Sequence, residues 1–485
     1  MPPRYWRLLS DTRTYQGGTL VSDADPTLAA IEGLAQRQRA DFLSGRSRDV
    51  GFRIARLRQL RAAVASSEER IQAALKADLG KPELEGYGSE VSPLLNELDA
   101  LIAHTARWAR PRRVPTPLLV PGRSVVYPEP YGAVLVMAPW NYPLQLALIP
   151  AAGAIAAGNH VTIKPSEYAP ATAQVIADLV ASCFDPEHVT VVMGGPGHGA
   201  ALTAQQWDYI FFTGGTAVGT LVMKAAAEYL TPVTLELGGK NPCVVTQHAD
   251  LVAAAKRIAW GKFFNAGQTC IAPDYLLVHR SVKERLIEEL RLSLGRFYGD
   301  DPAASPDYGR IVGERQLGCL VSMLSGERVV IGGQSDASQR YLAPTVVDDV
   351  TWESPLMAEE IFGPILPILT YDDLETTMRD LVRRPKPLAA YLFSRDPAEK
   401  RLMEGFSAGG VVINDVIMHF NNPNLPFGGV GQSGMGAYHG KRTFTTFTHD
   451  KAVVIRRGWP RLLGVRWPPY RLPMWLIRLS LRWFG

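Results

Sequence analysis

The chain has 485 residues, 46% of them hydrophobic and 20% charged. This composition is typical of a globular protein with more than one domain and excludes a disordered chain. Its four cysteines form no CxxC pair and no histidine-rich cluster, which argues against a disulfide scaffold and against a metal site. Because no long apolar stretch with a small-residue cleavage site follows Met1, we expect no secretory signal and a cytoplasmic protein with reduced thiols.

The formal net charge of +4 is unevenly distributed along the chain. Eight of the 51 basic residues and none of the 47 acidic residues lie in 451–485, so the rest of the chain carries a small negative charge. A body of this kind has no evident basic surface for nucleic acid, and we expect no nucleic-acid partner.

The chain from residue 27 to residue 110 has the apolar spacing of helices. Residues 53–76 carry apolar residues at helical spacing, among them Leu57, Leu60 and Val64, with Arg and Glu on the other face. The proline-rich stretch 111–130 then predicts a crossing or linker segment.

After this stretch, short apolar strands end in Gly or Pro and lead into helices. The predicted strands lie at 134–137, 161–163, 189–193 and 209–212. Such alternation predicts a parallel sheet with helices on both faces, in which ligands bind at the carboxyl ends of the strands. A second α/β pattern runs from 238 to 410. The segment after it has a different pattern, with a predicted strand at 411–413 and a glycine-rich loop at 426–431.

Three residues in these segments are suited to covalent catalysis on a carbonyl compound. Cys270 offers a soft nucleophile, and Glu236 offers a base that can activate water. Asn141 follows a predicted strand and can donate its amide N–H to a developing oxyanion, with the backbone N–H of Cys270 as second donor. The alternatives are a buried cysteine, a glutamate in a turn, and an asparagine that caps a helix starting near Tyr142.

Residues at other strand ends are suited to a dinucleotide. The run TGGTAVG at 213–219 follows an apolar strand and opens a helix, so its backbone N–H groups can approach a diphosphate. Lys164 can reach ribose hydroxyls or a phosphate, and Glu167 can accept from an adenosine ribose. A plain tight turn and a surface lysine are the alternatives.

Glu360 and Phe362 lie just before a Gly-Pro stop. The carboxylate suits the hydroxyls of a nicotinamide ribose, and the aromatic ring suits packing on the cofactor. The alternative is a helix end with a core phenylalanine.

Together these fragments resemble the aldehyde dehydrogenase superfamily. Five motifs occur in the family's order: PWN at 139–141, KPSE at 164–167, LELGGK at 235–240, GQTC at 267–270 and EIFGP at 360–364. The run PFGGVGQSGMGAYHGK at 426–441 is similar to the class 3 branch, which includes fatty and aromatic aldehyde dehydrogenases. One departure is Gly215, where family members often carry Asn.

The resemblance implies an α/β fold with a Rossmann-type nucleotide-binding domain, an α/β catalytic domain and a small β element that bridges subunits in at least a dimer. The expected domains are 27–111 with 134–236 for the nucleotide, 237–410 for catalysis, 112–133 with 411–450 for bridging, and 451–485 as a basic tail.

The resemblance also implies oxidation of an aldehyde with NAD or NADP. Cys270 would form a thiohemiacetal and then a thioester, Asn141 would hold the oxyanion, and Glu236 would activate the water that releases a carboxylic acid. The expected cofactor contacts are Trp140, Lys164, Glu167, Gly214, Gly219, Glu360 and Phe362, and the expected substrate contact is Tyr142. A non-catalytic scaffold recruited to membranes by its tail is the alternative, but it predicts loss of Cys270, Glu236 or Asn141, and all three are present.

The tail combines basic residues with four tryptophans and several prolines. A short helix is predicted after Pro473, and charges interrupt every apolar stretch well short of the ~20 residues that span a bilayer. Such a segment, 459–485, is typical of the interface of an anionic membrane, here on the inner face, and the alternative is a tail folded over the partner subunit or the substrate mouth. Membrane contact favours a long-chain or other lipophilic aldehyde, with aromatic aldehydes left open.

Overall fold

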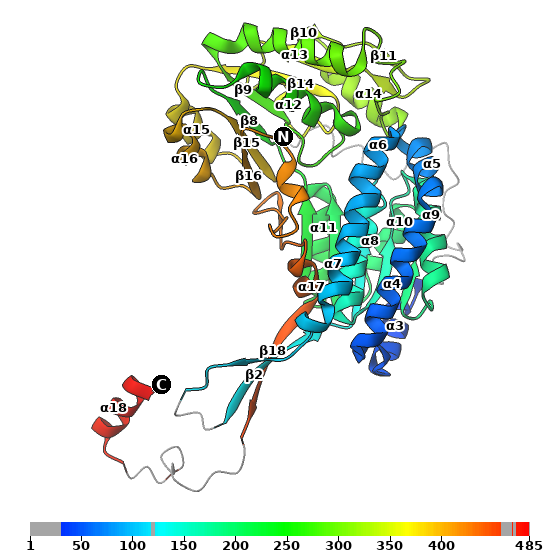
Figure 1. Ribbon diagram of the computed structural model, residues 1–485, viewed down its shortest axis with the longest axis vertical. Helices are drawn as coiled ribbons and strands as arrows, with labels where there is room; N and C mark the ends of the chain where they lie inside the picture. The colour runs from blue at the N-terminus through cyan, green and yellow to red at the C-terminus, as the bar shows by residue number, and fades with distance from the viewer. Residues whose placement is uncertain (1–30, 118–121, 457–467, 469–471, 485) are drawn as a thin grey trace.

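The computed structural model describes residues 31–117, 122–456, 468 and 472–484. Within them the predicted α/β fold is confirmed: a six-stranded sheet and a seven-stranded sheet each carry helices, and a three-stranded sheet projects from the body (Figure 1). A two-stranded ribbon of β11 (Ser335–Asp336) and β12 (Tyr341–Leu342) lies beside the larger sheet.

The six-stranded sheet has the order β17-β7-β6-β3-β4-β5, and all of its pairs are parallel except β17 with β7. Its strands are β3 (Ala133–Met137), β4 (His160–Lys164), β5 (Val189–Val191), β6 (Tyr209–Gly214), β7 (Val233–Leu237) and β17 (Gly434–Met435). Strands β3 and β4 are almost completely buried, as expected of a parallel sheet covered on both faces.

Helices from two parts of the chain cover this sheet (Figure 1). They are α3 (Leu34–Leu43), α4 (Val50–Ser66), α5 (Glu68–Leu79), α6 (Glu83–Gly86), α7 (Ser92–Trp108), α8 (Gln145–Ala157), α9 (Pro170–Cys183), α10 (Pro196–Thr203) and α11 (Thr216–Ala227). Every residue of α8 is buried, because this helix is apolar all round and packs between β4, α7 and the short helix α17 (Lys441–Thr446).

The helical spacing predicted at 53–76 is confirmed, with a break that the spacing did not predict. The structure has two helices, α4 and α5, which meet at Ser67, whose backbone is not helical. The local sequence explains the break, because serine favours helix ends and Glu68 and Glu69 favour the positive N-terminus of a new helix.

The seven-stranded sheet has the order β10-β13-β14-β9-β8-β15-β16, and all of its strands run parallel except β10. The strands are β8 (Pro242–Val245), β9 (Tyr275–His279), β10 (Arg328–Ile331), β13 (Thr345–Asp348), β14 (Ile365–Tyr371), β15 (Ala389–Phe393) and β16 (Gly410–Ile413). Its helices are α12 (Leu251–Phe263), α13 (Lys283–Tyr298), α14 (Glu314–Met323), α15 (Leu374–Val382) and α16 (Pro397–Glu404).

The projecting sheet pairs β2 (Arg123–Pro130) with β1 (Arg112–Val114) on one side and with β18 (Thr448–Ile455) on the other. Two expected boundaries differ from this arrangement. Strand β16, expected in the bridging element, pairs with β15 through its β-branched run and so belongs to the seven-stranded sheet. Strand β18 continues to Ile455, because all eight of its residues pair with β2, so the tail begins after that residue and not at 451.

The tail is described only in part. Trp459 and Trp467 lie outside the described residues, whereas the helix predicted after Pro473 is present as α18 (Met474–Phe484), beyond the far end of the projecting sheet (Figure 1). Among the residues that the structure describes, no helix has the length and apolar character needed to cross a membrane.

Candidate active site

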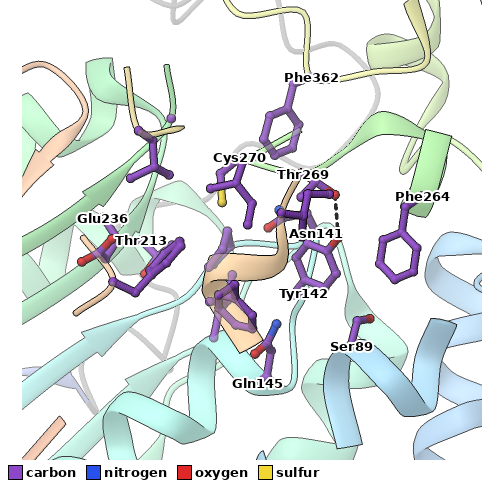
Figure 2. Close-up of a pocket in the computed structure, with 18 of the residues that line it drawn as sticks. Ser89, Asn141, Tyr142, Gln145, Thr213, Glu236, Phe264, Thr269, Cys270 and Phe362 are labelled. Carbon is purple, nitrogen blue, oxygen red and sulfur yellow. Dashed lines mark hydrogen bonds between the residues drawn. The ribbon is translucent and has the colours of Figure 1, made fainter. Parts of the chain in front are cut away.

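A cavity of about 520 Å³ lies between the two large sheets and is lined from both (Figure 2). The six-stranded side contributes residues after β3 and at the ends of β6 and β7, as expected for ligand sites at carboxyl ends. The other side contributes Cys270, Glu360 and Phe362, and the short segment around Leu84 and Gly88 contributes a third wall.

Cys270 follows a backbone turn held in an unusual conformation. Asn265 and Ala266 both have positive φ, 52° and 51°, and Gly267 follows at 74°. A side chain at Gly267 would place its Cβ 2.3 Å from the carbonyl oxygen of Gly363, so this position requires glycine. Strain of this kind persists where the surroundings fix it, and it is typical of functional sites.

Buried hydrogen bonds fix that turn. The Asn265 backbone N–H donates to Glu85 Oε2 at 2.9 Å, and its side-chain amide donates to the carbonyl oxygens of Asn141 (3.0 Å) and Gln268 (3.1 Å). Asn241 donates through its amide to the carbonyl oxygen of Cys270 at 2.8 Å. The nucleophile is therefore held from several directions before any ligand binds.

The Cys270 thiol is protonated at neutral pH in this arrangement. Burial raises its pKa to about 12, and the carboxyl groups of Glu360 and Glu236 add to the rise, while the backbone N–H groups of Cys270 and Ile271 oppose it. A thiolate at Cys270 would thus need a positive charge that these residues do not supply.

Glu236 is the penultimate residue of β7 and is buried, with 3% of its surface exposed. Among the described residues, neither of its carboxyl oxygens has a hydrogen-bond partner. Burial raises the pKa of Glu236 well above its usual range, which moves it towards the pH at which a general base works. The side chain faces the same cavity as Cys270 (Figure 2).

Asn141 does not cap a helix, because α8 begins later, with Leu144 as its N-cap. One hydrogen of its amide donates to the carbonyl oxygen of Gln268 at 3.1 Å, which leaves a second N–H for a ligand. Its own carbonyl oxygen accepts from Lys81 Nζ at 2.9 Å as well as from Asn265. The structure therefore brings Asn141, Cys270 and Glu236 to one cavity.

Lys81 and Glu90 form a fully buried ion pair behind Asn141, with 2.7 Å between Nζ and Oε1. The second oxygen of Glu90 accepts from the backbone N–H groups of Leu144 and Gln145 at 3.1 and 3.0 Å. The pair thus ties down both ends of the segment from Asn141 to Gln145. Burial raises the pKa of Glu90 and lowers that of Lys81, and their mutual attraction opposes both shifts.

Tyr142, the expected substrate contact, lines the cavity. Its hydroxyl bonds to Thr269 Oγ1 at 2.5 Å, and Lys81 Nζ lies 4.1 Å from the centre of its ring (Figure 2). These contacts hold the ring next to the nucleophile turn.

Four expected cofactor residues lie together at the cavity. The Trp140 and Phe362 rings meet edge to face at 5.3 Å, and Gly214 and Glu360 also line the wall. Glu360 packs so closely on Gly238 that a Cβ at that glycine would lie 1.9 Å from its carboxyl oxygen. Burial raises the pKa of Glu360 to about 8.

Lys164, Glu167 and Gly219 lie outside that cavity. Lys164 ends β4 and donates to Glu167 Oε2 at 3.3 Å and to the carbonyl oxygen of Pro165 at 2.8 Å. Packing explains the glycine at 219. A Cβ there would lie 2.6 Å from the Leu237 side chain, so glycine lets α11 approach β7.

These residues fit a dinucleotide. The N-terminus of α11 has Gly215 as N-cap and no side-chain capping bond, and a Cβ at Gly215 would meet nothing within 4 Å. An uncapped helix end at the carboxyl edge of a parallel sheet is suited to a diphosphate, and Lys164 ends a strand at the same edge. At the nicotinamide end of the dinucleotide, Glu360 is suited to the ribose, and the Trp140 and Phe362 rings are suited to packing on the cofactor.

Sequence reasoning missed the residues that hold the reacting groups. Lys81 lies in the short loop between α5 and α6, and Glu85 and Glu90 lie in helical segments; none of the three carries a local signal of a role. Gln268 lies in the GQTC motif, and Asn265 lies two residues before that motif. Their nearness to Cys270 in the sequence was a signal that could have identified them.

Comparisons with known proteins agree with this geometry. The model of the aldehyde dehydrogenase family matches residues 15–453. The chain is 48% identical to 4,4'-diaponeurosporen-aldehyde dehydrogenase of Staphylococcus aureus, over 91% of this chain and 97% of the relative. It is 44% identical to the dimeric NADP-preferring aldehyde dehydrogenase of the dog, over 91% and 98%.

A solved structure is also similar: the substrate-bound state of Staphylococcus aureus AldH has a TM-score of 0.91 at 45% identity, and the match covers 93% of this chain and 99% of that one. Family model, relatives and fold agree, so the chain belongs to the aldehyde dehydrogenase family and is an NAD(P)-dependent aldehyde dehydrogenase.

Proposed function

We propose that this aldehyde dehydrogenase oxidises long-chain or other lipophilic aldehydes to carboxylic acids. The observation that carries the proposal is an apolar wall in the lining of the cavity. That wall consists of Leu84, Leu146, Trp260, Phe264, Ile417 and Phe420. The Staphylococcus relative, named for a diaponeurosporen aldehyde, supports the same class of substrate.

The proposed reaction begins at Cys270. The thiol gives its proton to solvent, the thiolate sulfur attacks the aldehyde carbon, and the Asn141 amide and the Cys270 backbone N–H hold the resulting oxyanion. Bound NAD(P)⁺ supplies the hydride acceptor, and the carbon is left as a thioester on Cys270. Glu236 then takes a proton from water, the water oxygen attacks the thioester carbon, and the carbon–sulfur bond breaks to release the acid.

A series of straight-chain aldehydes tests the substrate class. Burial of each added methylene stabilises the bound substrate, so kcat/KM should rise about fourfold per methylene until the wall is filled. Ile417→Asn should flatten that rise while leaving short aldehydes nearly unaffected. A wild-type series that is flat or falls with length would contradict a lipophilic substrate without questioning aldehyde oxidation.

The exposed apolar side chains of α18 support contact with an anionic membrane. Met474 and Trp475 are 60% and 65% exposed, Leu479 is 50% exposed, and Arg478 and Arg482 are exposed as well. Such a helix is suited to lie in the interface of an anionic bilayer. The full chain should sediment with phosphatidylserine vesicles and a chain lacking 459–485 should not; equal binding of both would contradict the proposal.

The projecting sheet supports a homodimer. Strand β18 is an edge of that sheet and β16 is an edge of the seven-stranded sheet, and one dog relative is named dimeric. Sedimentation equilibrium should give twice the 53.1 kDa mass of the chain, and a mass of one chain at micromolar concentration would contradict the dimer.

A further inference from the structure

The cavity beside Cys270 contains a second buried polar group that the proposed reaction does not use. Tyr438 lines the cavity and is completely buried, and among the described residues its hydroxyl has no hydrogen-bond partner. Buried polar groups in proteins are almost always paired, so an unpaired one at a cavity wall indicates a missing ligand or water. Glu236, with two unpaired oxygens, lines the same cavity.

Strand register places Tyr438 and Glu236 on the same face of the six-stranded sheet. Thr213 of β6 pairs with Glu236 of β7, and Phe211, two residues earlier in β6, points to the same face as Thr213. The Tyr438 ring packs against Phe211 with 5.4 Å between ring centres and an interplanar angle of 77°. The phenol therefore lies over the part of the sheet that ends in the Glu236 carboxyl.

A glycine in the neighbouring strand pairs with Glu236. Gly434 of β17 pairs with Glu236 from the other side, and its φ of 136° suits glycine. A Cβ at Gly434 would lie 2.0 Å from the carbonyl oxygen of Leu235. Glycine at this position therefore lets β17 approach β7 closely beside Glu236. Thr213 Oγ1, on the opposite side, is also unpaired among the described residues.

Tyr438 is held rigidly. Its backbone N–H donates to the carbonyl oxygen of Phe427 at 2.8 Å, and the Phe427 N–H donates back at 3.0 Å. The Phe427 ring lies 5.8 Å from the Tyr438 ring, nearly perpendicular to it. Burial raises the pKa of Tyr438 well above its usual value, and Glu236 and Cys270 add to the rise, so the phenol stays neutral. A neutral phenol both donates and accepts a hydrogen bond.

From these contacts we infer that the Tyr438 hydroxyl is a catalytic group of the hydrolytic half-reaction: it binds, together with Glu236, the water that releases the acyl group from Cys270. This inference rests on the roles proposed for Cys270 and Glu236. The water gives one proton to the Glu236 carboxylate and hydrogen-bonds to the Tyr438 oxygen. Its oxygen bonds to the thioester carbon, the carbon–sulfur bond breaks, and the Cys270 thiolate leaves with the electron pair.

Tyr438→Phe tests the inference, because it removes the hydroxyl and keeps the ring. NADH formed in a single turnover, before acyl release, should be unchanged in rate. The steady-state rate should fall about tenfold or more, the effect of losing one hydrogen bond in the hydrolytic step. Intact-protein mass spectrometry during turnover should show the acyl group accumulating on the variant.

Tyr209→Phe is the matched control. Tyr209 lies on the same face of β6, and its hydroxyl bonds to Thr234 Oγ1 at 2.6 Å, away from the cavity. This variant should keep both rates and show no acyl-enzyme. The two variants should also differ in stability: loss of an unpaired hydroxyl should leave the melting temperature of Tyr438→Phe unchanged or raised, and loss of a paired one should lower it.

Addition of 2-mercaptoethanol gives an independent readout. The thiol attacks the thioester in place of water, so it should restore turnover in Tyr438→Phe if hydrolysis is the impaired step. An unchanged steady-state rate in Tyr438→Phe, or an equal loss in the single turnover, would overturn the inference. If Glu236→Gln also fails to accumulate acyl-enzyme, the role proposed for Glu236 fails with it; if it accumulates acyl-enzyme and Tyr438→Phe does not, the inference alone fails.

Discussion

Two regions of this molecule each bury a glutamate completely and treat it in opposite ways. Glu90 accepts from Lys81 and from two backbone N–H groups at the start of α8. Glu236, at the end of β7, has no partner among the described residues. A buried carboxyl whose oxygens are hydrogen-bonded within the protein holds other groups in place. One whose oxygens have no partner in the protein is available to a ligand or water. The contrast suits Glu90 to positioning other groups and Glu236 to the chemistry of the same site.

Glu236→Gln is expected to have the largest effect on rate. Loss of the base should reduce steady-state turnover by about 100- to 10,000-fold, while NADH formation in a single turnover persists. Because the carboxyl has no partner to lose, the midpoint of urea unfolding should not fall. A fall in that midpoint would mean that Glu236, like Glu90, is a structural residue.

The same variant should change how stability depends on pH. The folded-state pKa of Glu236 is raised above the usual 4.5, so the folded chain binds the proton more tightly than the unfolded chain. Stability from this group is therefore present at low pH and is lost as pH rises above 4.5 towards the raised pKa. Unfolding of Glu236→Gln should show a smaller loss over that range, and equal slopes would contradict the shift.

Lys81→Met should, in contrast, lower stability. It leaves Glu90 buried without its cation, which should reduce the free energy of unfolding by about 3–5 kcal/mol. The double variant Lys81→Met with Glu90→Leu should recover much of that loss, because no lone charge remains. If the single variant is as stable as wild type, the pair does not hold the Asn141 segment.

The smallest expected effect concerns Cys270. With its pKa at about 12, alkylation by iodoacetamide should be slow at pH 7 and should rise about tenfold per pH unit, following the thiolate fraction. If NAD⁺ binds through Glu360 and Phe362 as expected, its positive charge would favour the thiolate, so saturating NAD⁺ should speed alkylation at pH 7. Cys319, a free cysteine that does not line the cavity, serves as the control. Its rate of alkylation should not respond to NAD⁺. A fast, cofactor-independent reaction at Cys270 would contradict the raised pKa.

The sequence predicted the parallel sheets and the residues that meet at the cavity, because motifs at strand ends are local features. It did not predict that Lys81 would hold Asn141, because sixty residues separate the two and no spacing rule joins a helix end to a loop across that distance. Strand β16 was misassigned for a related reason: a run of β-branched residues predicts a strand but not the sheet in which it pairs. The motif containing Tyr438 was recognised by resemblance, and its hydroxyl gained a meaning only with the register of β6 and β7, which puts Glu236 on the sheet face that the Tyr438 ring contacts through Phe211.

The reacting groups reach the cavity from two separate sheets, whereas part of its apolar wall comes from neither. Leu84 lies in α6, and Phe420 lies in the turn Met418–Asn421, and neither bears on the bonds that fix Cys270 or Asn141. Changes in this wall can thus retune which molecules are admitted without disturbing the chemistry. Diversification of substrate range, in nature or in the laboratory, should concentrate there and spare the strand ends.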